Sequence, residues 1–356
     1  MEQREKVVVA MSGGVDSSVA AVMLREQGFD VIGIMLRLWS EPGKERENRC
    51  CTPDSMAIAR RVAARFSISF YAVDAQEVFY QAVVNSFING YTQNATPNPC
   101  LVCNQQIRWG FLLQHTLALN AQFLATGHYA RLRQDDSGKV QLLRAIDENK
   151  DQSYVLHTLR QHHLKHTLFP LGDLTKPEVR ELARKFNIPS AERPDSQDLC
   201  FLGNTDYRQF LAKYAQEPVN PGPIFSSSGE RLGTHPGLAY YTIGQRKGLG
   251  VSSPQPLYVL EKDSSRNALI VGSADELGRC ELIAKDTNWI SGTAPDKPFR
   301  AQVKIRYKAI PEWAEVHPQP NKQTRILFER SVRDITPGQA AVIYQDEVCL
   351  GGGIIN

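Results

Sequence analysis

The sequence has few cysteines, no long apolar run and almost no excess of charge of either sign. Its 356 residues include seven cysteines, too few and too oddly numbered for a disulfide scaffold, so we expect a protein of the reducing cytoplasm. No apolar run approaches the roughly 20 residues that cross a bilayer, and the acidic start at residues 1–6 does not resemble a signal peptide, so we expect no membrane partner. The 41 basic and 38 acidic residues exclude a strongly basic protein but not a local basic patch.

The pattern of apolar residues changes once along the chain. Over most of the N-terminal half, short apolar strands alternate with helical stretches, which is typical of a mostly parallel α/β sheet. Beyond Pro218, proline and glycine become frequent and the apolar runs turn short and β-branched, which predicts two small all-β units. We therefore expect an α/β domain over residues 1–203 and mostly-β domains over 204–282 and 283–356. The first should contain strands at 6–11, 31–39, 70–74 and 123–126 and helices at 15–27, 53–66, 77–91 and 104–119.

A glycine-rich loop follows the first expected strand. Residues 7–11 run into the sequence S-G-G-V-D-S-S at residues 12–18, and a helix follows. This order puts backbone N–H groups and a helix N-terminus at the carboxyl end of a strand, where they attract an anion. The loop lacks the Gly-Lys-Ser/Thr end of a Walker A motif and the third glycine of a Rossmann fingerprint. It resembles the pyrophosphatase loop of enzymes that split ATP between the α and β phosphates, and the alternative is a plain βα turn.

Two cysteines lie in loops suited to chemistry. Cys103 follows a proline-stiffened stretch and is expected just before a helix capped by Asn104, and a thiol near a helix N-terminus ionises more readily to the nucleophilic thiolate. Cys200 follows a polar loop far along the chain. Catalytic use of this pair is one reading of the sequence, and two others stay open.

The first alternative is a zinc site. Cys100 and Cys103 have metal-ligand spacing, and the pair Cys50 and Cys51 could complete a set of four. The second is simple burial, the commonest fate of a cysteine outside a disulfide. For Cys280 and Cys349, which lie in β-like segments without polar neighbours, burial is the expectation.

A basic strand is the best candidate for a nucleic-acid surface. Residues 299–308 alternate strictly, so that a strand would bury one set of side chains and expose the other. The exposed set would be Arg300, Gln302, Lys304, Arg306 and Lys308, able to meet phosphates. The alternative is a merely solvated face. A polar helix surface near RNA is also expected from four clustered histidines, His157, His162, His163 and His166.

Six motifs occur in order along the chain, and together they identify a family resemblance. They are S-G-G-V-D-S-S, N-P-C-L-V-C-N from Asn98, T-G-H-Y-A-R from Thr126, K-D-Q-S-Y from Lys150, D-S-Q-D-L-C-F from Asp195 and T-I-G-Q-R-K-G-L-G from Thr242. The set resembles the bacterial tRNA-specific 2-thiouridylases over essentially the whole chain. The resemblance implies an adenine nucleotide alpha hydrolase-like ATP-binding domain, a central β-rich domain and a C-terminal tRNA-binding β-barrel.

The resemblance also implies an activity and its participants. Such an enzyme uses ATP, with transient Mg²⁺, to adenylate C2 of wobble uridine 34 in the tRNAs for Lys, Glu and Gln. Sulfur then replaces the C2 oxygen, and AMP and pyrophosphate are released. A cysteine desulfurase or a sulfur-relay protein supplies the sulfur as a persulfide. No stable cofactor or resident metal is implied.

Site residues follow from the same resemblance, position by position. Cys103 would be the nucleophile and Cys200 the persulfide carrier, the two forming a transient disulfide. ATP would contact Ala10, Met11, Ser12, Gly13, Gly14, Val15, Asp16, Ser17, Leu36 and Gly127. The tRNA would contact Asn98, Pro99, Cys100, His128, Lys150, Asp151, Gln152, Arg306, Tyr307 and Gln339. At Cys100 some relatives carry an aspartate proposed as acid or base, so no catalytic duty is assigned to this residue.

Two other functions remain compatible with parts of the sequence. An ATP pyrophosphatase of the amidotransferase or synthetase type, acting on a small metabolite, would explain the glycine loop but needs neither two loop cysteines nor a basic strand. A zinc-stapled RNA-binding protein would explain the cysteines but leave the glycine loop without a role.

Overall fold

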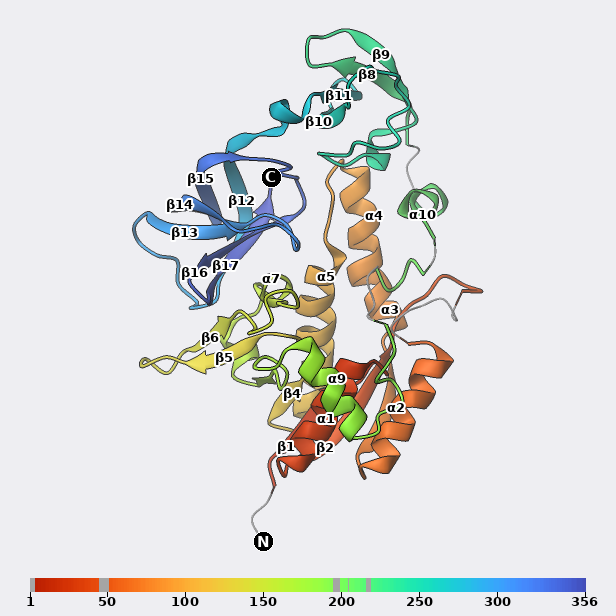
Figure 1. The fold of residues 1–356 in the computed structure, drawn as a ribbon, viewed down its shortest axis with the longest axis vertical. Coiled ribbons are helices and arrows are strands. Elements are labelled where there is room, and N and C mark those ends of the chain that lie inside the picture. Colours follow the sequence, from red (N-terminus) through yellow and green to blue (C-terminus); the bar gives the residue numbers. More distant parts are fainter. Residues whose placement is uncertain (1–3, 45–50, 195–198, 204, 216–218) are drawn as a thin grey trace.

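The computed structural model describes residues 4–44, 51–194, 199–203, 205–215 and 219–356 (Figure 1). An α/β unit, a small central unit and a C-terminal barrel follow one another along the chain, as the colours show. In the part of the chain that is described, no helix is long and apolar enough to span a membrane.

A five-stranded parallel sheet forms the core of the first unit. Its strand order is β3-β2-β1-β4-β7, and every neighbouring pair runs parallel. The chain therefore steps from β1 outward to β2 and β3, and only later to β4 on the other side of β1. The strands are β1 (Lys6–Ala10), β2 (Asp30–Arg37), β3 (Ser69–Asp74), β4 (Phe123–Ala125) and β7 (Thr167–Leu168).

Strand β1 is buried on both faces because helices cover both sides of the sheet. Val7 and Val9 belong to one core and Val8 to the other, and all three are fully buried, as the period of two along a strand requires. The first core is closed by α1 (Val15–Glu26), α2 (Pro53–Arg65) and α9 (Lys176–Lys185). The second is closed by the continuous helix α5 (Pro99–Val102), η2 (Cys103–Leu112) and α6 (Leu113–Ala118).

The expected helices are present, but one begins earlier than predicted. The helix expected from Asn104 starts at Pro99, with Asn98 as its N-cap: the Asn98 side chain accepts a hydrogen bond of 3.1 Å from the Cys100 N–H. Asn104 is buried inside the helix, so its assignment as the cap was wrong. Asn98-Pro99 is the stronger start signal, because proline suits the first helical position. The helix expected at 77–91 is the run α3 (Gln76–Phe79), η1 (Tyr80–Val84) and α4 (Asn85–Thr92).

The central unit is a small four-stranded sheet with the order β10-β11-β8-β9. Its core contains Ile224, Val259, Leu269 and Val271, all fully buried. The elements are α10 (Tyr207–Tyr214), β8 (Gly222–Ser226), β9 (Arg231–His235), η3 (Leu238–Tyr240), β10 (Tyr258–Asp263), β11 (Ala268–Gly272) and η4 (Ala274–Leu277). In Figure 1 it lies above α4, against which η3 packs.

The C-terminal unit is a closed barrel. Its strands follow the order β12-β15-β14-β13-β16-β17, and β12 pairs with β17 to complete the ring. They are β12 (Arg279–Trp289), β13 (Phe299–Lys304), β14 (Glu312–Gln319), β15 (Gln323–Val332), β16 (Ala340–Gln345) and β17 (Val348–Ile355). The predicted fold class, an α/β domain followed by two mostly-β units ending in a barrel, is confirmed. Cys349 is buried as expected, whereas Cys280 is exposed on β12, contrary to expectation.

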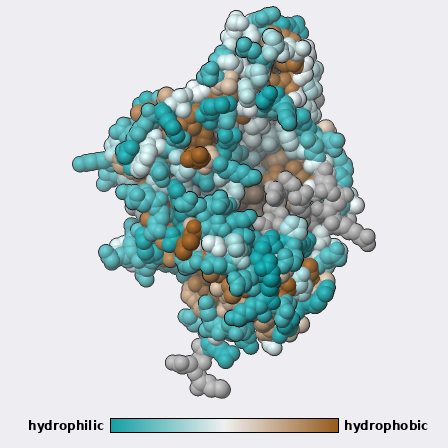
Figure 2. All heavy atoms as spheres, viewed as in Figure 1, coloured by the Kyte–Doolittle hydropathy of each residue, from teal (hydrophilic) through white to brown (hydrophobic). Residues whose placement is uncertain are grey.

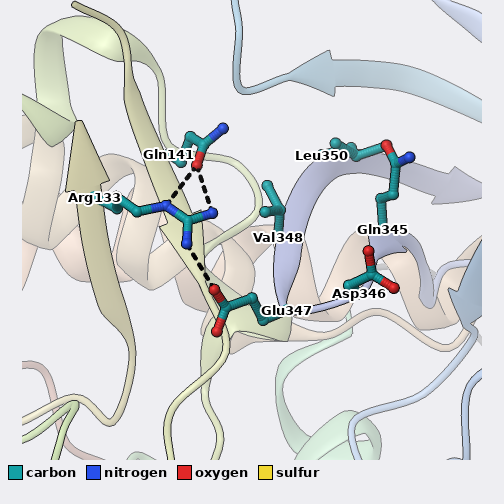
Figure 3. A pocket seen from close by; sticks show the side chains of 7 residues that line it. All are labelled: Arg133, Gln141, Gln345, Asp346, Glu347, Val348 and Leu350. Carbon is teal, nitrogen blue, oxygen red and sulfur yellow. Dashed lines mark hydrogen bonds and ion pairs between the residues drawn. The ribbon is translucent and has the colours of Figure 1, made fainter. Parts of the chain in front are cut away.

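A hairpin from the first unit extends the barrel sheet. Strands β5 (Arg131–Gln134) and β6 (Val140–Leu143) pair with each other, and β6 pairs with β17 at Val348 and Cys349. A pocket of about 270 Å³ lies at this seam. Figure 3 shows Arg133 bridging it, with Nη1 2.8 Å from the Glu347 carboxylate and two nitrogens donating to Gln141. The hairpin thus fixes the barrel against the α/β unit.

Candidate functional site

Serine hydroxyls and a glycine fix the conformation of the loop between β1 and α1. Gly13 has φ of +72°, and a Cβ there would lie 2.2 Å from the Ser55 carbonyl oxygen, so only glycine fits. The Ser17 hydroxyl accepts a hydrogen bond of 3.1 Å from the Ser12 N–H and lies 3.2 Å from the Ser12 hydroxyl. Gly14 is the N-cap of α1, so the loop and the N-terminus of α1 form one potential anion site.

Gly127 closes this site from the neighbouring strand. It follows β4, and a Cβ on it would lie 2.7 Å from the Ser17 nitrogen. Since the chain leaves β1 toward β2 on one side and reaches β4 only later on the other, the carboxyl ends of β1 and β4 flank the switch point of the sheet. Open α/β sheets bind their ligands in a crevice at such a point. The glycine loop and Gly127, remote in sequence, therefore lie side by side where the ligand crevice is expected.

Asp16 is fixed by two residues that the sequence did not reveal. The Lys176 ammonium lies 2.7 Å and 2.8 Å from the two Asp16 carboxylate oxygens, and the Tyr129 hydroxyl donates to the first of them over 2.8 Å. The Lys176 side chain is only 9% exposed. Lys176 stands at the start of α9, directly after the N-cap residue Thr175. No pattern could have linked it to residue 16.

A second cation reaches the loop from the segment before Cys200. The Arg193 guanidinium donates a hydrogen bond of 3.0 Å to the Ser55 hydroxyl, on the first turn of α2 beside Gly13. Thr52 caps that helix by accepting from the Ser55 N–H over 3.1 Å. The N-terminus of a second helix, α2, therefore packs against the glycine loop at Gly13. Residues 195–198, between Arg193 and Cys200, lie outside the described part of the chain.

The other predicted ATP contacts are buried or half-buried residues of the loop and of the neighbouring strand ends. Met11 and Val15 are buried in the core of the sheet, so they can offer a ligand only backbone atoms. Ala10 and Leu36 are half-buried at the ends of β1 and β2. The Ser18 hydroxyl is fully buried without a hydrogen-bond partner among the described residues.

Cys103 and Cys200 border the same hydrophobic cluster. Both are half-buried and pack on a group of aromatic side chains that includes Phe87, Phe201 and Phe210. Phe201, the neighbour of Cys200, lies 5.3 Å from Phe87 and 5.6 Å from Phe210 between ring centroids. The fold therefore brings to one cluster two cysteines that are far apart in sequence. Cys103 lies one turn inside its helix rather than before it.

Several predicted tRNA contacts converge where the barrel meets the α/β unit. The pKa of the Tyr307 hydroxyl is raised to about 12, by burial and by the nearby Asp151 carboxylate and Cys100 thiol. Asp151 is buried and accepts hydrogen bonds from Ser153 and from the Ala145 N–H. Cys100 itself is exposed at the first turn of α5. Tyr307, Asp151 and Cys100 therefore lie near one another at this junction.

Two further predicted contacts tie the loops of this junction together. The Gln339 amide donates a hydrogen bond of 2.7 Å to the Thr96 carbonyl, two residues before Asn98. The Thr96 N–H in turn donates to the Pro337 carbonyl over 2.8 Å. Arg306 is bound at 2.9 Å to the Asp334 carboxylate. Figure 2 shows the surface hollowed between the barrel and the central unit.

His128 and Gln152 are part of the framework under this surface. His128 is buried, with Nδ1 2.8 Å from the Thr126 hydroxyl and Nε2 3.4 Å from Arg108. Burial and the Arg108 charge hold its pKa well below the usual value, so the ring is neutral. Gln152 exchanges two hydrogen bonds with the Tyr129 backbone. Lys150, half-buried, lies in the turn before Asp151.

The histidine surface expected from the sequence is only partly a surface. His162 lies exposed on α8 (Gln161–Leu164). His157, however, is fully buried at the end of α7 (Ser153–Leu156), where Nδ1 lies 2.7 Å from the Tyr154 carbonyl. Burial lowers its pKa to about 4. The expectation was wrong for His157 because a polar residue inside a short helix gives no periodic signal of burial.

The basic strand exposes less positive charge than predicted. The alternation holds, since Ala301, Val303 and Ile305 are buried. Arg300, however, is paired with Glu329 at 2.6 Å and stacks on Trp313. Lys304 is half-buried, which lowers its pKa, and it lies near Asp151. Arg300, Arg306 and Lys308 are exposed as expected. Two of them are paired with carboxylates, which the sequence did not indicate because charges on neighbouring strands cannot be aligned from it.

Comparison with known proteins identifies the family. Three domain models match in order: a tRNA methyl transferase HUP domain over residues 5–204, a tRNA methyl transferase PRC-barrel domain over 208–273 and an aminomethyltransferase beta-barrel domain over 279–355. The tRNA-specific 2-thiouridylase MnmA of Magnetococcus marinus is 46% identical over 357 residues, covering 100% of both chains. The chain belongs to the tRNA-specific 2-thiouridylase family. The predicted resemblance is confirmed.

Other thiouridylases match over similar lengths. Those of Natranaerobius thermophilus and Symbiobacterium thermophilum are 43% and 44% identical, covering 100% and 99% of this chain and 98% and 92% of theirs. Among solved structures, a 4-thiouridine synthetase–RNA complex with bound ATP is similar at a TM-score of 0.35 and 16% identity, covering 59% of this chain and 50% of that one. Similarity at that level carries no functional inference.

Proposed function

We propose that this member of the thiouridylase family adenylates C2 of wobble uridine 34 in tRNA and replaces the C2 oxygen with sulfur carried as a persulfide on Cys200. The observation that carries the proposal is the convergence of two features. A pyrophosphatase-type loop lies at the switch point of the sheet, and Cys103 and Cys200 border one cluster. A uracil carbonyl is a poor electrophile, so both parts are needed.

The first step uses the crevice between β1 and β4. The O2 oxygen of the deprotonated uracil ring attacks the α-phosphorus of ATP, and pyrophosphate leaves. Gly13 and Gly127 let the loop pack closely against Ser55 and Ser17. Backbone N–H groups at the start of α1 and the hydroxyls of Ser12 and Ser17 are the available donors to phosphate oxygens. Lys176 and Arg193 supply positive charge beside the site.

Mg²⁺ would enter as the counter-ion of the ATP phosphates, where it balances charge and polarises the α-phosphorus. Asp16 is the carboxylate of the loop that could reach it. Both Asp16 oxygens already lie within 2.8 Å of the Lys176 ammonium. The described residues therefore support Asp16 as an organiser of the loop, and no step below depends on the metal.

The second step exchanges sulfur for the activated oxygen. In one route the terminal sulfur of the Cys200 persulfide attacks C2 and AMP leaves, and the Cys103 thiolate then attacks Cys200 Sγ, leaving sulfur on the base. In the other, the Cys103 thiolate first attacks Cys200 Sγ and expels hydrosulfide, which then attacks C2 as AMP leaves. Both routes end with a Cys103–Cys200 disulfide formed by ordinary thiolate attack. A dithiol reductant must reopen it, which fits a reducing cytoplasm.

The partners of the cycle follow from this chemistry. The tRNAs are those for Lys, Glu and Gln, and the target base must be extruded to reach the crevice. Asn98, Pro99 and Cys100 are proposed to meet that base, because Cys100 is exposed beside Tyr307 at the domain junction. A cysteine desulfurase, directly or through a relay protein, is proposed to load Cys200.

The alternatives fit the structure less well. A small-metabolite synthetase would not need a junction of three units next to its cysteines. For the zinc-stapled protein, the described residues contain no group of three or more potential ligands, although Cys50, which that alternative needs, lies outside them. Incubation with unmodified tRNA, ATP, Mg²⁺ and a persulfide donor separates the readings. AMP formation that requires tRNA supports thiolation, and AMP formation without RNA favours the synthetase.

A further inference from the structure

The loop Thr242–Gly250, with the sequence T-I-G-Q-R-K-G-L-G, has no part in the chemistry above. It connects η3 to the strand β10 of the central unit. Arg246 and Lys247 at its tip are exposed. Three glycines, Gly244, Gly248 and Gly250, have φ of +82°, +73° and +73°, which shapes the tip as a tight turn. The proposed chemistry therefore leaves the Thr242–Gly250 motif without an assigned role.

The loop is held rigidly by its own hydrogen bonds. The Gln245 side chain accepts from the Thr242 N–H over 3.2 Å and donates to the Lys247 carbonyl over 2.9 Å. The Gly244 N–H donates to the Val259 carbonyl over 2.8 Å, and the Val259 N–H donates to the Gln245 carbonyl over 3.0 Å. The two exposed cations are therefore presented on a fixed backbone rather than on a free coil.

The loop lies against the junction that holds the predicted tRNA contacts. A Cβ on Gly244 would lie 2.2 Å from Asp334 Oδ1, so the loop touches the residue that binds Arg306. At its start, the Thr242 hydroxyl lies 3.5 Å from the hydroxyl of Thr96. Thr96 precedes the segment Asn98–Cys100. The loop is thus continuous with the surface on which the target base is proposed to enter.

Among the described residues, the exposed cations of this loop have no acidic partner. Within the described residues, Arg246, Lys247 and the neighbouring Arg333, which lies over the Tyr258 ring, have no carboxylate within ion-pair distance. Arg208 extends toward Gly248, and its Nε is buried without a hydrogen-bond partner in the same part of the chain. On the barrel, by contrast, four exposed arginines are paired: Arg300 with Glu329, Arg306 with Asp334, Arg325 with Glu281 and Arg330 with Glu312.

We propose that the Thr242–Gly250 loop binds phosphates of the tRNA backbone beyond the target nucleotide, through Arg246 and Lys247. A rigid loop with clustered, unpaired cations gains most from a ligand with several fixed negative charges, and an RNA strand leaving the junction provides them. Binding of the phosphates then offsets the electrostatic repulsion among these cations. This inference rests on the proposed function, because it takes tRNA as the ligand.

The salt dependence of tRNA binding tests the proposal. The Arg246→Gln/Lys247→Gln variant should weaken tRNA binding by about tenfold near physiological salt and lower the slope of log Kd against log salt by about two units, one for each phosphate contact. The matched control is Arg231→Gln/Lys297→Gln, which removes one arginine and one lysine from exposed positions elsewhere, and it should keep the wild-type slope.

Each outcome decides between the possibilities. An unchanged slope in the loop variant, with wild-type protein binding tRNA normally, overturns the loop assignment and leaves the proposed function standing. A loss of sulfur transfer from a protein donor but not from free sulfide, with tRNA affinity intact, also overturns it and assigns the loop to an acidic protein partner. If the wild-type protein neither binds nor thiolates tRNA, the proposed function fails and this inference fails with it.

Discussion

The Lys176 ammonium contacts both carboxylate oxygens of Asp16, at 2.7 Å and 2.8 Å, across 160 residues of sequence. The pair joins the start of α9 to the first turn of α1, directly after the glycine loop. A bare carboxylate at that point would repel the phosphates that the loop and the helix N-terminus attract. We therefore expect Lys176 to favour nucleotide binding electrostatically.

Lys176→Met leaves the Asp16 carboxylate uncompensated beside the phosphates and should therefore weaken ATP binding by roughly tenfold or more. A tenfold loss corresponds to about 1.4 kcal/mol of binding free energy. Calorimetric titration with ATP measures the effect. The double variant Asp16→Asn/Lys176→Met removes both charges and should bind ATP more tightly than Lys176→Met alone. Equal ATP affinity for wild type and Lys176→Met would remove the electrostatic role.

Gly127→Ala should disable the nucleotide crevice. The added methyl group would lie 2.7 Å from the Ser17 nitrogen and 2.8 Å from the Asp16 carbonyl carbon, both backbone atoms, so the loop must move. Overpacking of this kind typically costs about 1–3 kcal/mol, and ATP affinity should fall as well. Gly233→Ala is the control, because its nearest contact would be a side-chain methyl at 3.3 Å. Wild-type ATP binding by Gly127→Ala would show that this contact does not shape the site.

Asn98→Ala should loosen the first turn of the helix that carries Cys103. The lost bond is the one from the Cys100 N–H to the Asn98 side chain, and loss of an N-cap costs about 1 kcal/mol. Asn98→Ser keeps a capping oxygen and should recover most of the loss. Urea unfolding of the three proteins measures the difference. If serine and alanine behave alike in unfolding, the cap contributes nothing to stability.

Acidification should destabilise the protein in part through His157. Burial lowers its pKa to about 4, below the value of about 6.5 in an unfolded chain. The unfolded state therefore takes up a proton first as the pH falls. The stability present above pH about 6.5 is lost progressively toward pH 4, by about 2 kcal/mol at pH 5. His157→Gln, which does not titrate, should flatten the pH dependence of the unfolding free energy over this range, and an unaltered profile would assign the loss to other groups.

The sequence predicted those parts of the fold that depend on local patterns. The three buried valines of β1, the loop that follows and the alternating Ala301, Val303 and Ile305 are all read from periodicity and turn chemistry. The helix start was missed by five residues because Asn98-Pro99 was passed over in favour of Asn104. Capping signals compete along a polar stretch, and only the fold decides which one is used.

The parts that could not be predicted are contacts between distant segments. Lys176 on Asp16, Arg193 on Ser55 and Asp334 beside Gly244 each join segments more than 80 residues apart. The pairing of Arg300 with Glu329 neutralised a charge that the strand pattern alone would leave exposed. Pairings of this kind are set by the tertiary fold, which single-chain periodicity does not encode.

The pairing of Cys103 and Cys200 in sulfur transfer is tested most directly by nucleoside mass spectrometry of tRNA after reaction with ATP, Mg²⁺ and a persulfide donor. The wild-type protein should form 2-thiouridine at position 34, and Cys103→Ser and Cys200→Ser should each form none while binding ATP normally. Cys280→Ser, which removes the exposed cysteine of β12, should retain activity. Formation of 2-thiouridine by either Cys103→Ser or Cys200→Ser would contradict the proposed sulfur transfer.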